Sequence, residues 1–198
     1  MIIIQPSIDP TIISIGFLEI RWYSLAYIFA FIFGSVLIKK LNKKSHNLLT
    51  NIQIDKFFIW SVLGVIIGGR IGYVFFYQIE LFFLNPLYIF EIWKGGMSFH
   101  GGLIGVIFST YLFSIKNNKD IYIFLDLVAI TAPIGIFLGR ISNFINGELV
   151  GKVTNSKWGV FFPGYDDKLR HPSQLYEAFL EGIILFILMN LIFFNKNY

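Results

Sequence analysis

The stretch FFIWSVLGVIIGGRIGYVFFY, residues 57–77, decides the fold class, because it is long, apolar and carries a single charge, Arg70. A helix of about 20 largely apolar residues crosses the hydrocarbon core of a bilayer. The whole chain shares this character: of its 198 residues 56% are hydrophobic and 14% are charged, and the mean hydropathy is +0.68. A soluble domain of this size cannot hide so much apolar surface from water. The composition therefore predicts a multi-pass membrane protein and excludes disorder, a disulfide scaffold and most soluble folds.

Four further segments are long and apolar enough to cross a bilayer. The predicted spans are Ile20–Ile38, Phe57–Tyr77, His100–Ile115, Ile121–Leu138 and Leu175–Phe194. The predicted fold is thus an all-α transmembrane helical bundle of about five spans with a small loop region on its outer side. Residues 1–198 form a single membrane-embedded domain in this prediction. Leu81–Trp93 is apolar but contains Pro86, so we expect it to lie at the membrane interface rather than to span.

Lysines gather in alternate short loops, between the first and second spans and between the third and fourth. They are Lys39, Lys40, Lys43, Lys44, Lys56, Lys116 and Lys119. The positive-inside rule makes these loops cytoplasmic, so the N-terminus and the loops 78–99 and 139–174 face outward. Membrane orientation therefore explains the basic residues behind the net charge of +4, and we expect no nucleic-acid partner.

Several kinds of chemistry are excluded or disfavoured by the residue inventory. The chain has no cysteine, so it supplies no disulfide, zinc–thiolate cluster or thiol nucleophile. Its three histidines, at 46, 100 and 171, are scattered, and we expect neither a metal site nor a cofactor. No P-loop, Gly-x-Ser-x-Gly elbow or His-Glu-x-x-His motif is present in the sequence.

The densest polar cluster is GRISNFINGELVG, residues 139–151. Arg140, Asn143 and Asn146 are three residues apart, so they share one broad face while the chain is helical. Glu148 follows Gly147, where we expect the helix to end. A planar guanidinium suits phosphate oxygens, and amides can orient neighbouring oxygens. The cluster therefore favours a site for an anionic lipid headgroup, and the alternative is an ordinary helix end that enters a loop.

Two motifs at the predicted outer ends of spans leave both a functional and a structural interpretation open. In GGMSFHGGLIG, residues 95–105, Ser98 can cap the third span, and His100 is either a general base or a structural residue. In RHPSQLYEAFLEG, residues 170–182, capping by Ser173 and a favourable first-turn position can explain Ser173 and Glu177. The functional alternative is that Gln174 and Tyr176 line the cavity of the site.

Two more residues could have either a structural or a functional role. Arg70 inside a span is expected to face a polar cavity or to pair with an acid such as Asp126 or Glu177. Tyr23, in IRWYSLAY at the outer end of the first span, fits an aromatic belt on physical grounds alone.

With these residues in view, the chain resembles bacterial prolipoprotein diacylglyceryl transferase. The segments GGRIGYVFFY, GGMSFHGGLIG, GRISNFINGELVG and RHPSQLYE occur in the order of that family and span about residues 20–194. The resemblance implies transfer of the diacylglyceryl group from phosphatidylglycerol to the lipobox cysteine thiol of prolipoproteins. A thioether forms and glycerol phosphate leaves. The implied location is the bacterial cytoplasmic (inner) membrane with the active site toward the outer face, and the implied partners are phosphatidylglycerol, lipobox peptides and membrane lipid.

The resemblance also implies roles for individual residues. His100 is the implied base or polar activator of the thiol, and Arg140 and Glu148 are the other implied catalytic residues. The implied substrate-binding residues are Tyr23, Gly95, Arg140, Asn143, Asn146 and Gly151. Arg70 matches an arginine of structural or supportive role.

Two alternative functions accompany the transferase hypothesis. Family members usually continue through about two further spans, so the resemblance implies that these come from elsewhere or that activity is much reduced. The first alternative is accordingly a truncated, inactive protein that binds phosphatidylglycerol. The second is a small transporter, which is disfavoured because the sequence has no internal repeat.

Overall fold

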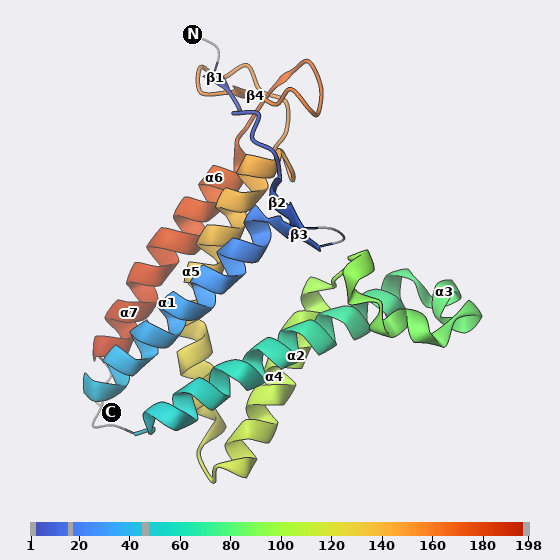
Figure 1. The fold of residues 1–198 in the computed structure, drawn as a ribbon. Helices are drawn as coiled ribbons and strands as arrows, with labels where there is room; N and C mark the ends of the chain where they lie inside the picture. The colour runs from blue at the N-terminus through green and yellow to red at the C-terminus, as the bar shows by residue number, and fades with distance from the viewer. Residues whose placement is uncertain (1–2, 16–17, 45–47, 196–198) are drawn as a thin grey trace. The chain divides into compact units, whose positions relative to one another are not determined.

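The computed structural model describes residues 3–15, 18–44 and 48–195, and its ribbon is drawn in Figure 1. Five helices are long and apolar enough to cross a membrane: α1 (Trp22–Lys44), α2 (Asn51–Tyr77), α4 (Phe99–Lys116), α5 (Ile121–Asn146) and the continuous run Ser173–Phe193. The five predicted spans and the helical membrane fold are confirmed. The last run is composed of α6 (Ser173–Glu177), a π-helical segment η3 (Ala178–Ile184) and α7 (Leu185–Asn195).

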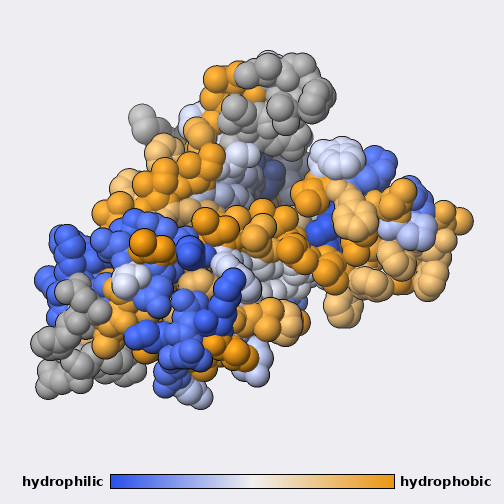
Figure 2. All heavy atoms as spheres, turned by 60° about the horizontal axis from the view of Figure 1, so that its bottom comes forward, coloured by the Kyte–Doolittle hydropathy of each residue, from blue (hydrophilic) through white to orange (hydrophobic). Residues whose placement is uncertain are grey.

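The chain divides into two compact units, each of which is described by itself. The central unit is Leu41–Val128, and the terminal unit is Met1–Lys40 together with Ala129–Tyr198. On the face drawn in Figure 2, hydrophobic side chains cover much of the surface and hydrophilic ones gather in patches. Large apolar side chains such as Phe33 on α1 and Ile59 on α2 are more than half exposed, which is the surface expected where lipid is the solvent.

Glycines bring α2 and α4 together in the central unit. A methyl group on Gly105 would lie 2.9 Å from the Cα of Gly68 and closer still to the carbonyl oxygen of Gly64. The two helix backbones are therefore in direct contact, as small residues permit in membrane helices. Towards one end of the pair, Phe57 and Phe113 pack together with ring centroids 5.6 Å apart. Thr50 starts α2 with a capping box that it shares with Gln53.

Short helical turns connect α2 to α4. They are α3 (Ile79–Leu84) and the 3-10 helices η1 (Pro86–Phe90) and η2 (Ile92–Lys94). The segment Leu81–Trp93 therefore does not form a continuous helix, as expected from Pro86. Its exposed Phe83 and Trp93 suit a membrane interface, and that location remains a prediction.

In the terminal unit α1 and the α6–α7 run both lie against α5 (Figure 1). A methyl group on Gly135 of α5 would touch Ala30 of α1, and one on Gly182 of η3 would lie 2.7 Å from the Cβ of Phe137 of α5. Through these contacts α1 and the α6–α7 run pack against α5.

Short strands at one end of the terminal unit are additions to the predicted helical bundle. β1 (Ile3–Ile4) pairs in parallel with β4 (Val160–Phe161), which pairs antiparallel with β5 (Leu169–Arg170). A separate hairpin joins β2 (Thr11–Ile15) to β3 (Leu18–Arg21). The predicted start of the first span at Ile20 is two residues early, because β3 precedes α1.

Candidate functional site

The C-terminal end of α5 places Glu148. Gly147 adopts φ 66°, and its N–H donates to the carbonyl of Phe144 at 3.2 Å, while the N–H of Glu148 donates to the carbonyl of Asn143 at 2.9 Å. This pair of bonds is a Schellman motif, which requires the left-handed residue that glycine supplies. The predicted end of the helix at Gly147 is confirmed, and the reversal keeps Glu148 beside the last turn of α5.

Three neutral donors hold the carboxylate of Glu148. The Tyr23 hydroxyl donates to Oε2 at 3.2 Å, Asn143 Nδ2 donates to the same oxygen at 3.5 Å, and Asn146 Nδ2 donates to Oε1 at 3.3 Å. We call these four residues the Glu148 cluster. The structure thus joins four of the predicted site residues, and Tyr23 belongs to a hydrogen-bonded cluster and not only to an aromatic belt.

The loop after α5 is tied down by residues that sequence reasoning did not assign to it. Gln174 is only 1% exposed, and its Nε2 donates to the carbonyl of Glu148 at 2.5 Å. Gln5 Nε2 donates to the carbonyls of Ile145 and Phe144 at 2.8 and 3.2 Å. A buried polar side chain needs such partners. The sequence signal for this contact is a glutamine in the first turn of an apolar span.

The prediction that Ser173 caps the last span is wrong. The N-cap is Pro172, which has no capping side chain, and Ser173 is the first helical residue. The Ser173 hydroxyl instead donates to the carbonyl of Leu149 at 2.9 Å. Leu149 adopts φ 54°, and this bond helps to fix the strained turn.

Arg140 contacts a different acid from the one in the Glu148 cluster. Its Nε lies 2.7 Å from Glu177 Oε2, and its Nη2 lies 3.9 Å from Glu181 Oε2. The Arg140 side chain is 30% exposed. Sequence reasoning gave Glu177 a first-turn role and named it only as a possible partner of Arg70. Its pairing with Arg140 was missed.

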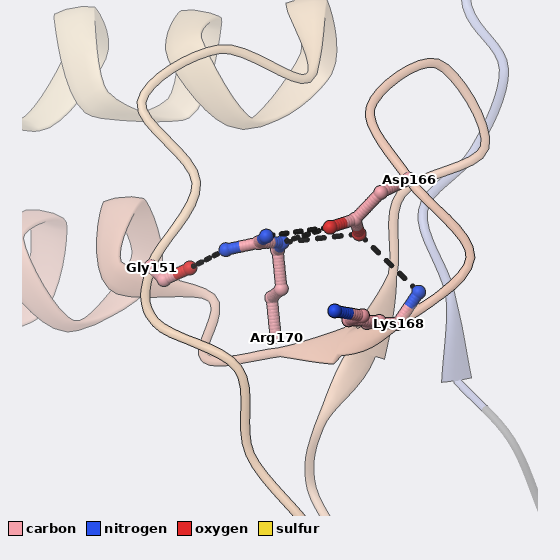
Figure 3. A network of polar contacts seen from close by, with 4 residues as sticks. All are labelled: Gly151, Asp166, Lys168 and Arg170. Atoms are coloured by element: carbon pink, nitrogen blue, oxygen red, sulfur yellow. Dashed lines mark hydrogen bonds and ion pairs between the residues drawn. The ribbon is translucent and has the colours of Figure 1, made fainter.

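Gly151 lies where two backbone segments meet (Figure 3). Its N–H donates to the carbonyl of His171 at 3.0 Å, and its carbonyl accepts from Arg170 Nη1 at 3.0 Å. A methyl group at Gly151 would lie 2.5 Å from the His171 oxygen. Glycine is therefore required sterically, and a substrate-binding role for Gly151 remains a prediction.

The Arg170 guanidinium is anchored by Asp166 in the same network (Figure 3). Arg170 Nη2 lies 2.5 Å from Asp166 Oδ2, and Arg170 Nε donates to Asp166 Oδ1 at 3.1 Å. These bonds to Arg170 hold the pKa of Asp166 below its ordinary value and raise the pKa of Arg170.

His100 and Gly95 belong to the central unit. His100 is the second residue of α4 and is exposed, with its ring edge-to-face against Phe99 at 5.6 Å between centroids. Ser98 accepts from the N–H of Gly101 at 3.2 Å, so the predicted N-cap is confirmed. His100 is therefore an exposed imidazole on the first turn of a capped helix, and its catalytic role remains a prediction.

Arg70 has backbone carbonyls as partners in place of the expected acid or cavity. It is 2% exposed. Its Nε donates to Ile89, its Nη2 to Tyr88 and its Nη1 to Gly95, at 3.1, 2.6 and 2.6 Å respectively. The Tyr88 ring also lies 4.7 Å from the guanidinium carbon. Arg70 thus ties the segment that carries Gly95 to α2, which is a structural role.

Comparisons with known proteins all match this chain to the same family. The family model described as prolipoprotein diacylglyceryl transferase matches residues 10–198. The phosphatidylglycerol–prolipoprotein diacylglyceryl transferase of Rickettsia bellii (strain OSU 85-389) is 45% identical over 192 residues, which are 97% of this chain and 73% of the relative. The proteins of the same name from Ehrlichia ruminantium (strain Welgevonden) and Ehrlichia canis (strain Jake) are 48% and 50% identical, over 95% and 94% of this chain and 72% and 71% of theirs. By the extent of these matches, this chain belongs to the prolipoprotein diacylglyceryl transferase family.

Proposed function

We propose that this chain transfers the diacylglyceryl group of phosphatidylglycerol to the cysteine thiol of a prolipoprotein lipobox. The observation that carries the proposal is the arrangement at the end of α5, where Arg140, Asn143 and Asn146 lie within two turns of the helix and Glu148, which follows it, also accepts from Tyr23 of α1. The names of these relatives state both substrates for those proteins. The absence of cysteine from this chain fits a reaction whose nucleophile belongs to the substrate.

The reaction balances without a cofactor. The thiol sulfur attacks the diacylglycerol carbon that carries the phosphate ester, so that a C–S bond forms and the C–O bond to phosphate breaks. Glycerol phosphate leaves with the bonding electron pair, and the thiol proton goes to a base. Negative charge that develops on the departing phosphate is stabilised by a guanidinium held in the right place. Arg140 has this role in the proposal, and Tyr23, Asn143, Asn146 and Glu148 bind the headgroup.

His100 is the proposed acceptor of the thiol proton. A neutral imidazole has a nitrogen that can accept a proton, and histidine is the usual general base. The test is His100→Gln, which keeps a polar side chain but cannot take up a proton. Retained transfer by this variant would show that only polarity is needed at position 100.

The proposed location is the bacterial cytoplasmic membrane, with the site toward its outer face. The support for this orientation is the position of the lysines. Lys43 and Lys44 end α1, and Lys116 ends α4, so the positive-inside rule makes these helix ends cytoplasmic. The opposite ends of the spans, including the end of α5 with its Glu148 cluster, then meet the outer interface, where lipid headgroups and a translocated lipobox peptide are both available.

Mass spectrometry of a lipobox peptide incubated with phosphatidylglycerol and the purified chain tests the proposal. A diacylglyceryl mass gain on the cysteine peptide, with none on its Cys→Ser counterpart, is expected. Arg140→Lys should lower the rate by about 100-fold, because a point charge does not reproduce the planar fork of a guanidinium. Lys152→Ala, which removes an exposed cation from the following loop, is the matched control and should transfer normally. Lipid binding without any mass gain would contradict the proposed transfer and support the binding-protein alternative.

A further inference from the structure

The ion pair between Arg140 and Glu177 uses only part of the guanidinium. Nε lies 2.7 Å from Glu177 Oε2, and Nη2 is 3.9 Å from Glu181 Oε2, beyond hydrogen-bond distance. Within the described residues Nη1 has no hydrogen-bond partner. A guanidinium carries five N–H groups in one plane, so the edge formed by Nη1 and Nη2 remains available to a second anion after Glu177 has bound the Nε side.

The contact depends on how two helices pack. Phe137 and Arg140 are one turn apart on α5, and they meet Gly182 and Glu177 respectively, so the two helices run antiparallel at this point. A methyl group at Gly182 would lie 2.7 Å from the Cβ of Phe137, which shows how closely η3 approaches α5. Glu177 is the last residue before the π-helical segment, and such segments occur frequently at functional sites.

We propose that Glu177 is a positioning residue for Arg140. It binds the Nε side of the guanidinium and thereby directs the Nη1–Nη2 edge at the phosphate of the lipid. This inference rests on the proposed function, because it assigns the phosphate of phosphatidylglycerol to Arg140. A flexible arginine would lose side-chain entropy each time it bound a phosphate, and an arginine already held at one edge has lost it beforehand.

The negative charge of Glu177 has an effect on lipid binding opposite to that of positioning, so substitutions can separate the two effects. A carboxylate 2.7 Å from the guanidinium also repels a phosphate, so removal of its charge alone should favour lipid binding. Glu177→Gln removes the charge but keeps an oxygen of the same reach beside Nε. Glu177→Asp keeps the charge but shortens the side chain by one methylene, and Glu177→Ala removes both the charge and the acceptor. Positioning predicts that Gln is tolerated while Asp and Ala are not.

Binding of phosphatidylglycerol to the purified full chain in detergent is the first measurement. Glu177→Ala and Glu177→Asp should weaken it by about tenfold, while Glu177→Gln should stay within about threefold of the wild type. Glu181→Ala is the matched control, because the Glu181 carboxylate is 52% exposed and outside hydrogen-bond distance. Diacylglycerol, which has the same acyl chains and no phosphate, should bind all variants alike, so a general loss of structure would be detected as a loss with both lipids.

Two further results complete the test. In an Arg140→Lys background, Glu177→Ala should cause little additional loss, because the two residues act as one unit. Tighter binding of phosphatidylglycerol by both Glu177→Gln and Glu177→Ala would overturn the proposal and make Glu177 a competitor of the phosphate. Unchanged binding by all three variants at position 177 would overturn it as well. Failure of the wild-type chain to transfer lipid would contradict the proposed function separately, since the binding measurement does not depend on turnover.

Discussion

Substitution of Gly105 by alanine should push α2 and α4 apart. The added methyl group would lie 2.9 Å from the Cα of Gly68 and nearer still to the carbonyl oxygen of Gly64. Carbon atoms in favourable contact are about 3.5–4.0 Å apart, so the helices must separate by at least about 0.6 Å at this point. Both neighbours are backbone atoms, and no flexible side chain can move aside.

The energetic cost follows from two opposing effects. Overpacking of a tight contact costs about 1–3 kcal/mol, and a contact between two backbones belongs at the upper end of that range. Alanine gains up to about 1 kcal/mol over glycine in a helix interior. The net loss is about 2 kcal/mol, which corresponds to a fall in Tm of about 4–8 °C for a chain of this size.

Gly102→Ala is a matched control on the same helix. A methyl group there would meet the Val65 side chain and carbonyl at 3.6–3.7 Å, which is ordinary contact, so this variant should keep or slightly raise the Tm. Thermal unfolding in detergent, followed by tryptophan fluorescence, measures both variants. Because His100 lies on the first turn of α4, Gly105→Ala should also lower the transfer rate. Equal melting temperatures for the two variants would refute the argument that the glycine backbones are in contact.

Two further predictions concern the terminal unit. Glu148→Gln should lower transfer by at least about tenfold, because the new amide nitrogen is a donor that faces the donors of Tyr23 and the asparagines. The Tm should change little, since Glu148 is exposed. Transfer equal to that of the wild type would contradict a role for the carboxylate. The loop closed by Asp166 and Arg170 should loosen in acid. The pKa of Asp166 is lowered in the folded state, so its stabilisation is complete above the unfolded pKa of about 3.9 and is lost as pH falls through the folded pKa. Limited proteolysis against pH should show increased cleavage of the loop, and Asp166→Asn should make it sensitive at neutral pH too.

The parts of the fold that the sequence predicts are those with a strong local signal. Each of the five spans is an apolar run of a length that few soluble helices reach. Gly147 marks the end of α5 and Ser98 the start of α4 by residue type alone, since left-handed backbone and N-caps have narrow preferences. Asn143, Asn146 and Glu148 are predicted from the polar cluster in the sequence and Tyr23 from the resemblance, and the hydrogen bonds that the other three donate to Glu148 show that this group is physically connected.

Other features depend on contacts between distant segments, which no local pattern encodes. β1 and β4 have two residues each and pair across most of the chain, so neither is long enough to show the alternation of a strand. The partners of Arg70 are carbonyls, and every residue has a carbonyl, so residue type cannot identify them. The prediction for Ser173 is wrong for a related reason. A hydroxyl at a helix start can bind either its own helix or another segment, and here it donates to the carbonyl of Leu149.

The pairing of charges in the terminal unit has a chemical consequence that residue identity alone does not reveal. Among the described residues, Arg140 and Glu148 do not form an ion pair with each other. Instead neutral donors from Tyr23, Asn143 and Asn146 hold Glu148, and Glu177 takes one side of Arg140. In the proposed reaction Arg140 and Glu148, which have separate partners, contact different parts of phosphatidylglycerol. A phosphate ester that departs from a diacylglycerol needs this division, because its anionic oxygens require a cation while its glycerol hydroxyls require an acceptor.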